Sequence, residues 1–217
     1  MRVIQSVVLA GILTFAAACS VGTVPPPPEG EFSFDYSLQE AEAGNPTQQY
    51  NIGQAYADGI EVAVDRAKAI EWWRKSADQG FAPAQYNLAR AYATGNGIGQ
   101  DLAQAKTLYE EAAAQDDPSA THNLGVIYAE GRGVERDMNQ AFEWFERGAK
   151  LGNPSSRFNL AAMLARGTAG EPDLVEAHKW FTMAINNPDG AEVAATAEAF
   201  RGEIEGAMSP EQLDAVK

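Results

Sequence analysis

The chain has few of the residues that carry redox or metal chemistry. It contains one cysteine, Cys19, and two histidines, and neither histidine has a Cys or carboxylate pattern nearby that is typical of a metal site. A single thiol excludes an intrachain disulfide. Basic residues are also scarce, with 16 Lys and Arg against 30 Asp and Glu and a formal charge of −14. Nucleic acid and anionic lipid surfaces are therefore not expected partners.

Long apolar runs are absent after the first eighteen residues, so no transmembrane helix is expected beyond them. Residues 1–18 have one basic residue followed by a short apolar run, which is typical of an export signal. Cys19 directly follows three alanines. This resembles the bacterial lipobox, in which the cysteine is acylated and becomes the mature N-terminus. The family usually has Leu three residues before the Cys, where this chain has Ala16. The alternative is an ordinary secretory signal, which would release the protein into the periplasm.

The segment after the signal predicts an anchored tether. Residues 19–31 contain four consecutive prolines, Pro25 to Pro28, which favour an extended polyproline II conformation. Ser20 stands where similar lipoproteins carry Asp if they stay in the inner membrane. The resemblance thus implies a lipid anchor in the outer membrane, with residues 32–217 facing the periplasm.

The rest of the chain is dominated by a repeat with a period of thirty-six residues. Its key positions return without a gap: Asn51, Asn87, Asn123 and Asn159; Gly59, Gly95, Gly131 and Gly167; Asp65, Asp101, Asp137 and Asp173; Ala69, Ala105, Ala141 and Ala177. A fixed period of this length is the signature of a stacked solenoid. The predicted repeats are 44–79, 80–115, 116–151 and 152–187.

Each repeat is predicted to be a helical hairpin. Apolar residues from Pro83 to Thr94 recur at helical spacing, and Gly95 then permits the positive φ of a C-cap. Asp101 is placed to N-cap a second helix that begins at Leu102. One hairpin cannot bury its apolar face alone, so stacking has to supply the core. The expected fold is an all-α, α/α superhelical solenoid.

Two kinds of residue are expected to pack the hairpins together. Small residues share one position of the first helix: Gly53, Ala89, Gly125 and Ala161. They allow two helices to approach closely. Aromatic residues begin a pair in the second helix, as Trp72, Trp144 and Trp180. We expect these tryptophans to fill gaps between hairpins, and a ligand-binding role is the alternative.

The third repeat, HNLGVIYAEGRGVERDMNQAFEWFERGA at residues 122–149, shows the whole pattern. It resembles the Sel-one-like repeat, a relative of the tetratricopeptide repeat, and the resemblance covers residues 44 to about 186. It implies a right-handed superhelix whose first helices line the concave face. Residues 34–44 align with a second helix alone and are expected to cap the first repeat. Residues 190–217 are expected to form a C-terminal cap.

Nothing in the sequence predicts catalysis. His122 occupies a position that other repeats fill with Tyr or Phe, so we expect it to pack, and His178 lies at a variable position. The glycine runs join helix to helix and follow no strand, unlike phosphate-binding loops. Related enzymes that act on β-lactams are rich in cysteine pairs, which this chain lacks. The expectation is a protein that is not an enzyme and has no metal and no cofactor.

The strongest candidate site is the asparagine row and its helical neighbours. Asparagine is a poor residue for a helix interior, so its repeated use there indicates a structural or binding role. One hypothesis is a hydrogen-bond ladder between repeats. The other follows from the resemblance to tetratricopeptide domains, whose concave asparagines hold an extended peptide. The candidate groove residues are Asn51, Gln54, Asn87, Arg90, Asn123, Asn159 and Arg166. Their neighbours Asp58, Thr94, Val126, Glu130 and Ala162 mix charges, so no preference for a charged partner is predicted.

Two functions remain open at this stage. The first is a lipid-anchored envelope scaffold that binds a protein or peptide through its concave face. The second is an accessory protein or hydrolase that acts on cell-wall or exopolysaccharide material, because the family is linked with envelope assembly and exopolysaccharide export. The absence of a catalytic constellation favours the scaffold.

Overall fold

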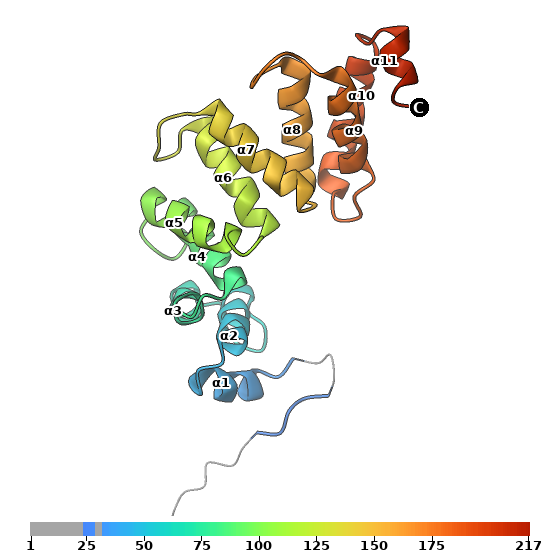
Figure 1. The fold of residues 1–217 in the computed structure, drawn as a ribbon. Helices are drawn as coiled ribbons and strands as arrows, with labels where there is room; N and C mark the ends of the chain where they lie inside the picture. Colours follow the sequence, from blue (N-terminus) through green and yellow to red (C-terminus); the bar gives the residue numbers. More distant parts are fainter. Residues whose placement is uncertain (1–23, 29–31) are drawn as a thin grey trace, which may run out of the picture.

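The computed structural model describes residues 24–28 and 32–217, and this part of the chain is built from helices without a strand (Figure 1). The helices are α1 (Phe34–Glu42), α2 (Pro46–Asp58), α3 (Arg66–Ala77), α4 (Ala82–Thr94), α5 (Leu102–Ala113), α6 (Pro118–Glu130), α7 (Met138–Lys150), α8 (Pro154–Arg166), α9 (Leu174–Ile185), α10 (Ala191–Glu205) and α11 (Pro210–Asp214). Cys19 lies outside the described residues.

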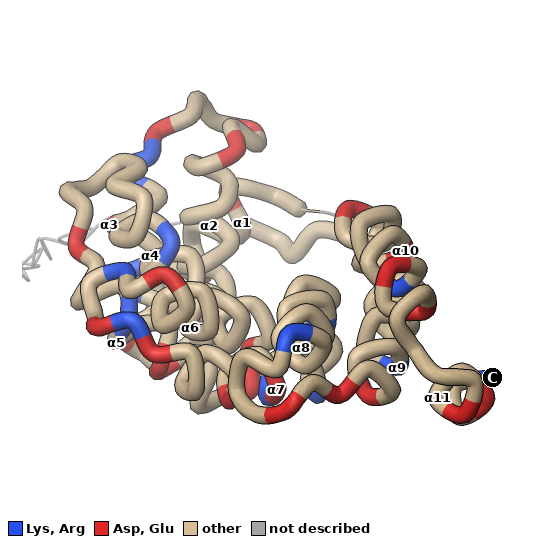
Figure 2. Tube along the Cα trace, turned by 90° about the horizontal axis from the view of Figure 1, so that it is seen from above, with Lys and Arg blue, Asp and Glu red and all other residues tan. Residues whose placement is uncertain are grey.

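Consecutive helices pair as antiparallel hairpins, α2 with α3, α4 with α5, α6 with α7 and α8 with α9. The hairpins stack in chain order from α1 at one end to α10 and α11 at the other (Figure 1). Seen from above, the first helices of the hairpins form an inner row and the second helices an outer row (Figure 2). The prediction of an all-α solenoid of four hairpins with a cap at each end is confirmed.

The helix ends follow the chemistry expected from the sequence. The α4 helix ends at Gly95, which has a φ of 73° and whose amide donates to the carbonyl of Ala91. The α5 helix begins after Asp101, whose carboxylate accepts hydrogen bonds from the amides of Ala103 and Gln104. The other three repeats carry the same pair of caps: Gly59 and Asp65, Gly131 and Asp137, Gly167 and Asp173. Each cap satisfies backbone groups that the helix leaves unpaired. The loops therefore have a fixed length, and the repeats keep their register.

The small residues of the first helices lie under aromatic rings of the second. A methyl group added to Gly125 would stand 2.5 Å from Cε1 of Phe145, which is closer than carbon atoms can approach. Gly53 lies in the same way under the indole of Trp73. The helix backbone and the ring are in direct contact at these two positions. Ala89 and Ala161, at the same repeat position, are also completely buried.

The aromatic pairs divide their roles in a way that the sequence analysis did not predict. The buried member is the second residue of each pair: Trp73, Tyr109, Phe145 and Phe181. The first member, also expected to pack, is only half-buried at Trp72, Trp144 and Trp180. Trp144 and Trp180 still pack against the edges of the core clusters, so a packing role is confirmed for them. The second member is more buried because its position in the helix faces the partner helix of its own hairpin.

The solenoid is closed at both ends by additional helices. At the N-terminal end, α1 packs against α2, with an edge-to-face contact of Phe34 and Tyr56. At the C-terminal end, α10 covers α8 and α9 and brings Phe200 against Phe158 and Phe181. Within residues 24–28 and 32–217, every helix is too short or too polar to cross a membrane.

Candidate binding groove

Four hollows follow one another along the first helices, and we call this row of hollows the groove. The first lies between the N-terminal cap and α2, the second between α2 and α4, the third between α4 and α6, and the fourth between α6 and α8. Their volumes are about 490, 180, 120 and 200 Å³, in that order. An asparagine of the repeated row lines each hollow: Asn51, Asn87, Asn123 and Asn159. The groove therefore repeats with the period of the sequence.

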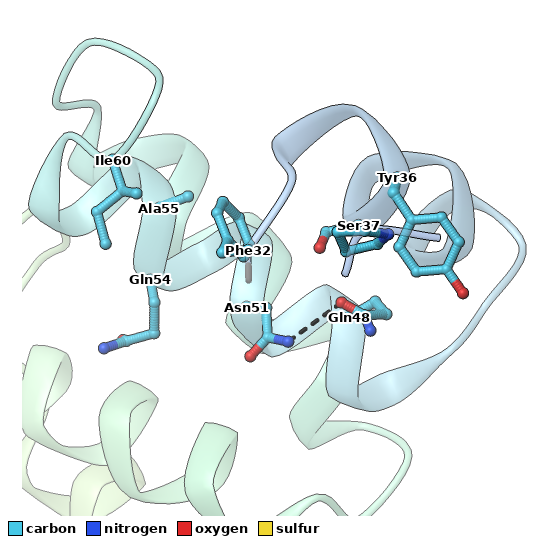
Figure 3. Close-up of a pocket in the computed structure, with 9 residues that line it drawn as sticks. Phe32, Tyr36, Ser37, Gln48, Asn51, Gln54, Ala55 and Ile60 are labelled. Atoms are coloured by element: carbon cyan, nitrogen blue, oxygen red, sulfur yellow. Dashed lines mark hydrogen bonds between the residues drawn. The ribbon is translucent and has the colours of Figure 1, made fainter. Parts of the chain in front are cut away.

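The first hollow is partly lined by the segment that precedes the solenoid. Phe32 and Pro27 stand against Asn51, Gln54 and Ala55 of α2, and Phe32 lies between α2 and the cap (Figure 3). The segment is also tied to the cap, because the amide of Val24 donates to Oε1 of Gln39 at 2.7 Å. The N-terminal end of the groove thus already holds part of this chain.

The second and third hollows share residues of α4. Arg90 and Thr94 line both of them, so the side chain of Arg90 stands on the ridge between two neighbouring hollows. The third and fourth hollows share Val126 of α6 in the same way. The wall of the fourth hollow contains the large apolar side chains of Phe145, Met138 and Met163.

Taken together, the second, third and fourth hollows are lined by more arginines than carboxylates, although the fourth has one of each. Their lining includes Arg66, Arg90, Arg132 and Arg166 against Asp58 and Glu130. This is the reverse of the whole chain, in which acidic residues outnumber basic ones by 30 to 16. Arg132 is paired with Glu130. In the described part of the chain, the other three arginines make no ion pair.

The asparagine row makes one bond between repeats. Nδ2 of Asn87 donates to Oε1 of Gln54 on the preceding first helix, 2.7 Å away, and Asn87 is buried. Asn51 and Asn123 instead bond within their own helices, to Gln48 and to the carbonyl oxygen of Ser119. Among the described residues, the asparagine row therefore forms a hydrogen bond between repeats only at Asn87, and its acceptor is a glutamine.

Burial and charge around the groove shift the pKa values of two tyrosines. The pKa of Tyr50 is raised chiefly by burial, while the neighbouring side chain of Asn87 and the positive charge of Arg90 act in the opposite direction. Burial also raises the pKa of Tyr109, against the charges of Arg90 and Arg132. Both tyrosines therefore stay neutral at physiological pH and serve as packing and hydrogen-bonding groups.

One donor beside the groove has no partner. Nε1 of Trp73 is buried and lacks a hydrogen-bond acceptor among the described residues. The indole lines the second hollow, and its Nε1 edge lies against Gly53. The other repeats have Tyr109, Phe145 or Phe181 at this position, which carry no indole N–H.

The two histidines are built into the packing. His122 lies beside Phe145, with ring centroids 5.6 Å apart, and its Nδ1 is 3.2 Å from Oγ of Ser156. Burial lowers its pKa to about 4. His178 is buried, and its Nε2 is 2.8 Å from Oε1 of Glu205. The described residues hold no group of three or more His, Cys, Asp or Glu side chains placed to bind a metal ion.

Part of the groove was not expected from the sequence. Arg66 begins α3 and Arg132 lies in the loop after α6, so neither belongs to the first helices that were expected to line the concave face. Arg66 is directly beneath the next repeat's loop, because a methyl group added to Gly97 would stand 2.8 Å from its Cβ. The glycine of that loop was the available signal, since a glycine in a tight loop often marks close contact with a neighbour.

Comparison with protein families identifies the class of fold. The Sel1 repeat model matches residues 49–81, 82–117, 118–153 and 154–189. The chain belongs to the Sel1 repeat family, which confirms the resemblance to Sel-one-like repeats. A comparison with curated proteins finds no match.

Two solved structures resemble the chain along most of its length. The Sel1 repeat protein from Oxalobacter formigenes is 32% identical, with a TM-score of 0.69, over 71% of this chain and 63% of that one. A protective antigen present in uropathogenic Escherichia coli strains, which displays an SLR fold, is 34% identical, with a TM-score of 0.70. That match covers 73% of this chain and 34% of the antigen. The chain thus spans less than two thirds of both proteins.

Proposed function

We propose that the protein is a lipid-anchored scaffold of the bacterial envelope that binds a protein partner in its groove. The observation that carries the proposal is the row of hollows in register along the first helices. Such a row offers one subsite per repeat to a chain that lies across it. Sel1 repeat solenoids typically mediate protein–protein interaction, and this agrees with the site.

The surface does not favour the alternative role in binding cell-wall glycans. Stacking of a sugar needs an open aromatic face. Nζ of Lys75 lies 3.8 Å from the ring centroid of Trp72, and the guanidinium of Arg147 lies over Trp144. Trp72 and Trp144 on the outer helices are therefore covered by cations of their own helix.

The anchor is proposed from the sequence around Cys19. A short apolar segment ends in three alanines before the only cysteine, and Ser20 follows it. Several acyl chains on Cys19 would hold the protein on a membrane far more firmly than a single acyl chain does. Replacement of Cys19 by Ser should release the mature chain or stall its precursor. Unchanged membrane fractionation, with no lipid mass on the N-terminal peptide, would reject the anchor.

The groove is tested by photo-crosslinking from defined positions. A photoreactive amino acid at Val126, which lines two hollows, is compared with one at Thr107, which is exposed on α5. We expect a discrete crosslinked species in the envelope from position 126 and none from position 107. Equal products from both positions, or none from either, would reject binding in the groove. Thermal midpoints of both variants check that the fold is retained.

A further inference from the structure

The charge of the groove differs in sign from the charge of the molecule. Arg66, Arg90, Arg132 and Arg166 line three of the hollows, whereas the chain as a whole carries a formal charge of −14. Placing unpaired arginines side by side in an acidic protein costs stability through mutual repulsion, and a ligand with negative charge relieves it. The lining therefore indicates a partner that carries carboxylates.

Arg90 and Arg166 are the best placed of the four to meet such a partner. Both are exposed side chains on first helices, and neither makes an ion pair within the described residues. An arginine presents its N–H groups in a planar fork that matches a carboxylate. Arg132 is less available because it is paired with Glu130.

The spacing of the repeats sets the spacing of the ligand. Neighbouring packed helices lie roughly 10 Å apart, and an extended chain rises about 3.3 Å per residue. One repeat therefore corresponds to about three residues of an extended segment. Arg90 and Arg166 are on α4 and α8, with Val126 of α6 between them. The order along the groove is thus a carboxylate at Arg90, an apolar side chain at Val126 and a second carboxylate at Arg166, which lies one helical turn beyond the position equivalent to Arg90.

We propose that the groove binds an extended acidic segment of a partner protein, with acidic residues at least about six positions apart and an apolar residue between them. This proposal rests on the proposed function and names the chemistry of its partner. Val126 shares the fourth hollow with Met138, Phe145 and Met163, which supply the apolar subsite. The first hollow takes no part, since Phe32 and Pro27 already line it.

The test uses labelled peptides and fluorescence anisotropy with the purified protein. One peptide carries Glu, Leu and Glu at intervals of three on a serine background, and a matched peptide has Gln in place of each Glu. We expect the Glu peptide to bind at least about ten-fold more tightly than the Gln peptide, because each carboxylate gains a charge-assisted hydrogen bond.

Protein variants show whether the arginines are responsible. Arg90→Gln and Arg166→Gln should each weaken the Glu peptide about ten-fold and leave the Gln peptide unchanged. Lys150→Gln removes one exposed positive charge on α7, away from the hollows, and should have no effect. Equal binding of the Glu and Gln peptides, no binding of either, or equal weakening by Lys150→Gln would overturn the proposal. A second copy of the chain in the groove would appear as self-association abolished by Arg90→Gln, and this too would overturn it.

The crosslinking experiment keeps this proposal distinct from the proposed function. If Arg90→Gln combined with Arg166→Gln leaves the crosslink from position 126 intact, the groove binds a partner, but the proposal that this partner offers an acidic segment is wrong. If the crosslink is absent in the unmodified protein as well, the function itself fails. Loss of the crosslink in the double variant alone supports both.

Discussion

Asn87 donates its amide to Oε1 of Gln54 at 2.7 Å, and this bond joins the first helices of two successive repeats. The equivalent bond is not repeated at Asn51 or Asn123, which bond within their own helices. Asparagine at this repeat position therefore joins two repeats at Asn87 but bonds within its own helix at Asn51 and Asn123. For Asn123 the difference arises because the position of Gln54 in the preceding repeat is held by Arg90, whose side chain cannot accept a hydrogen bond, and Asn51 lies in the first hairpin.

This difference predicts unequal costs for two equivalent substitutions. Asn87→Ala should lower the free energy of unfolding by about 1–2 kcal/mol, because the buried Asn87 loses its bond to the half-buried Gln54 on the preceding hairpin. Asn123→Ala should cost less than about 1 kcal/mol, because the bond it loses is local to its helix. Chemical denaturation of each variant measures both values. Equal costs would show that the bond between repeats contributes nothing beyond a local one, and a double variant with intact binding would place the asparagines outside the ligand site.

The contact of Gly125 with Phe145 predicts that one added methyl group destabilises the third repeat. Gly125→Ala should lower the free energy of unfolding by about 1–3 kcal/mol, since the methyl group would overlap the ring. A methyl group added to Gly202 of α10 would enter open space, so Gly202→Ala is the matched control. That change should be neutral or should stabilise by up to about 1 kcal/mol. Thermal melts of both variants suffice, and a stable Gly125→Ala protein would show that the ring can move aside.

The division of the aromatic pair predicts a large difference between adjacent substitutions. Phe145→Ala should cost about 3–5 kcal/mol, the range for emptying a large aromatic core site. Trp144→Ala should cost about 1–2 kcal/mol, because Trp144 is only half-buried and loses contacts on one side. Urea denaturation at equal protein concentration compares the two. If Trp144→Ala is as costly as Phe145→Ala, the first member of the pair belongs to the core.

Burial of His122 predicts that stability falls in mild acid. The pKa of His122 is about 4 in the folded protein and about 6.5 when unfolded, so the unfolded chain binds more protons between these values. Above pH 6.5 the histidine contributes no pH dependence. Between pH 6.5 and pH 4 its contribution falls by about 3 kcal/mol in total. Denaturation at pH 7 and pH 4.5, for wild type and for His122→Phe, isolates this term from the carboxylates. A pH dependence that is identical in both proteins would contradict the assignment.

The sequence was sufficient for the features that repeat. The spacing of glycine and aspartate predicted both helix ends of each hairpin, because caps act locally and leave a residue signature. The close approach at Gly53 and Gly125 was also predicted from residue size. These features depend on neighbours within one repeat, and a period of thirty-six residues reports them directly.

Features that depend on how repeats are placed relative to one another were not predictable in the same way. Trp72 and Trp73 are both large and apolar, and only the packed helix shows that Trp73 faces its partner. Arg66 and Arg132 reach the groove from outside the first helices, so the helical spacing around the asparagines could not include them. The contact of Val24 with Gln39 joins a proline-rich segment to a cap, and no periodicity links the two.

Each hairpin packs mainly on its sequence neighbours. The length of the groove therefore depends on the geometry of each interface between successive hairpins. Two interfaces between hairpins separate Arg90 from Arg166. A small rotation at either interface changes the distance between the two arginines. Gly148 lies at the second of these interfaces, where it contacts the side chains of Ser156 and Thr121. A larger side chain at this position would change the pitch of the superhelix without contacting the ligand. The length of the segment that can reach both arginines would change with it. The preferred ligand length can therefore depend on residues that do not themselves line the groove.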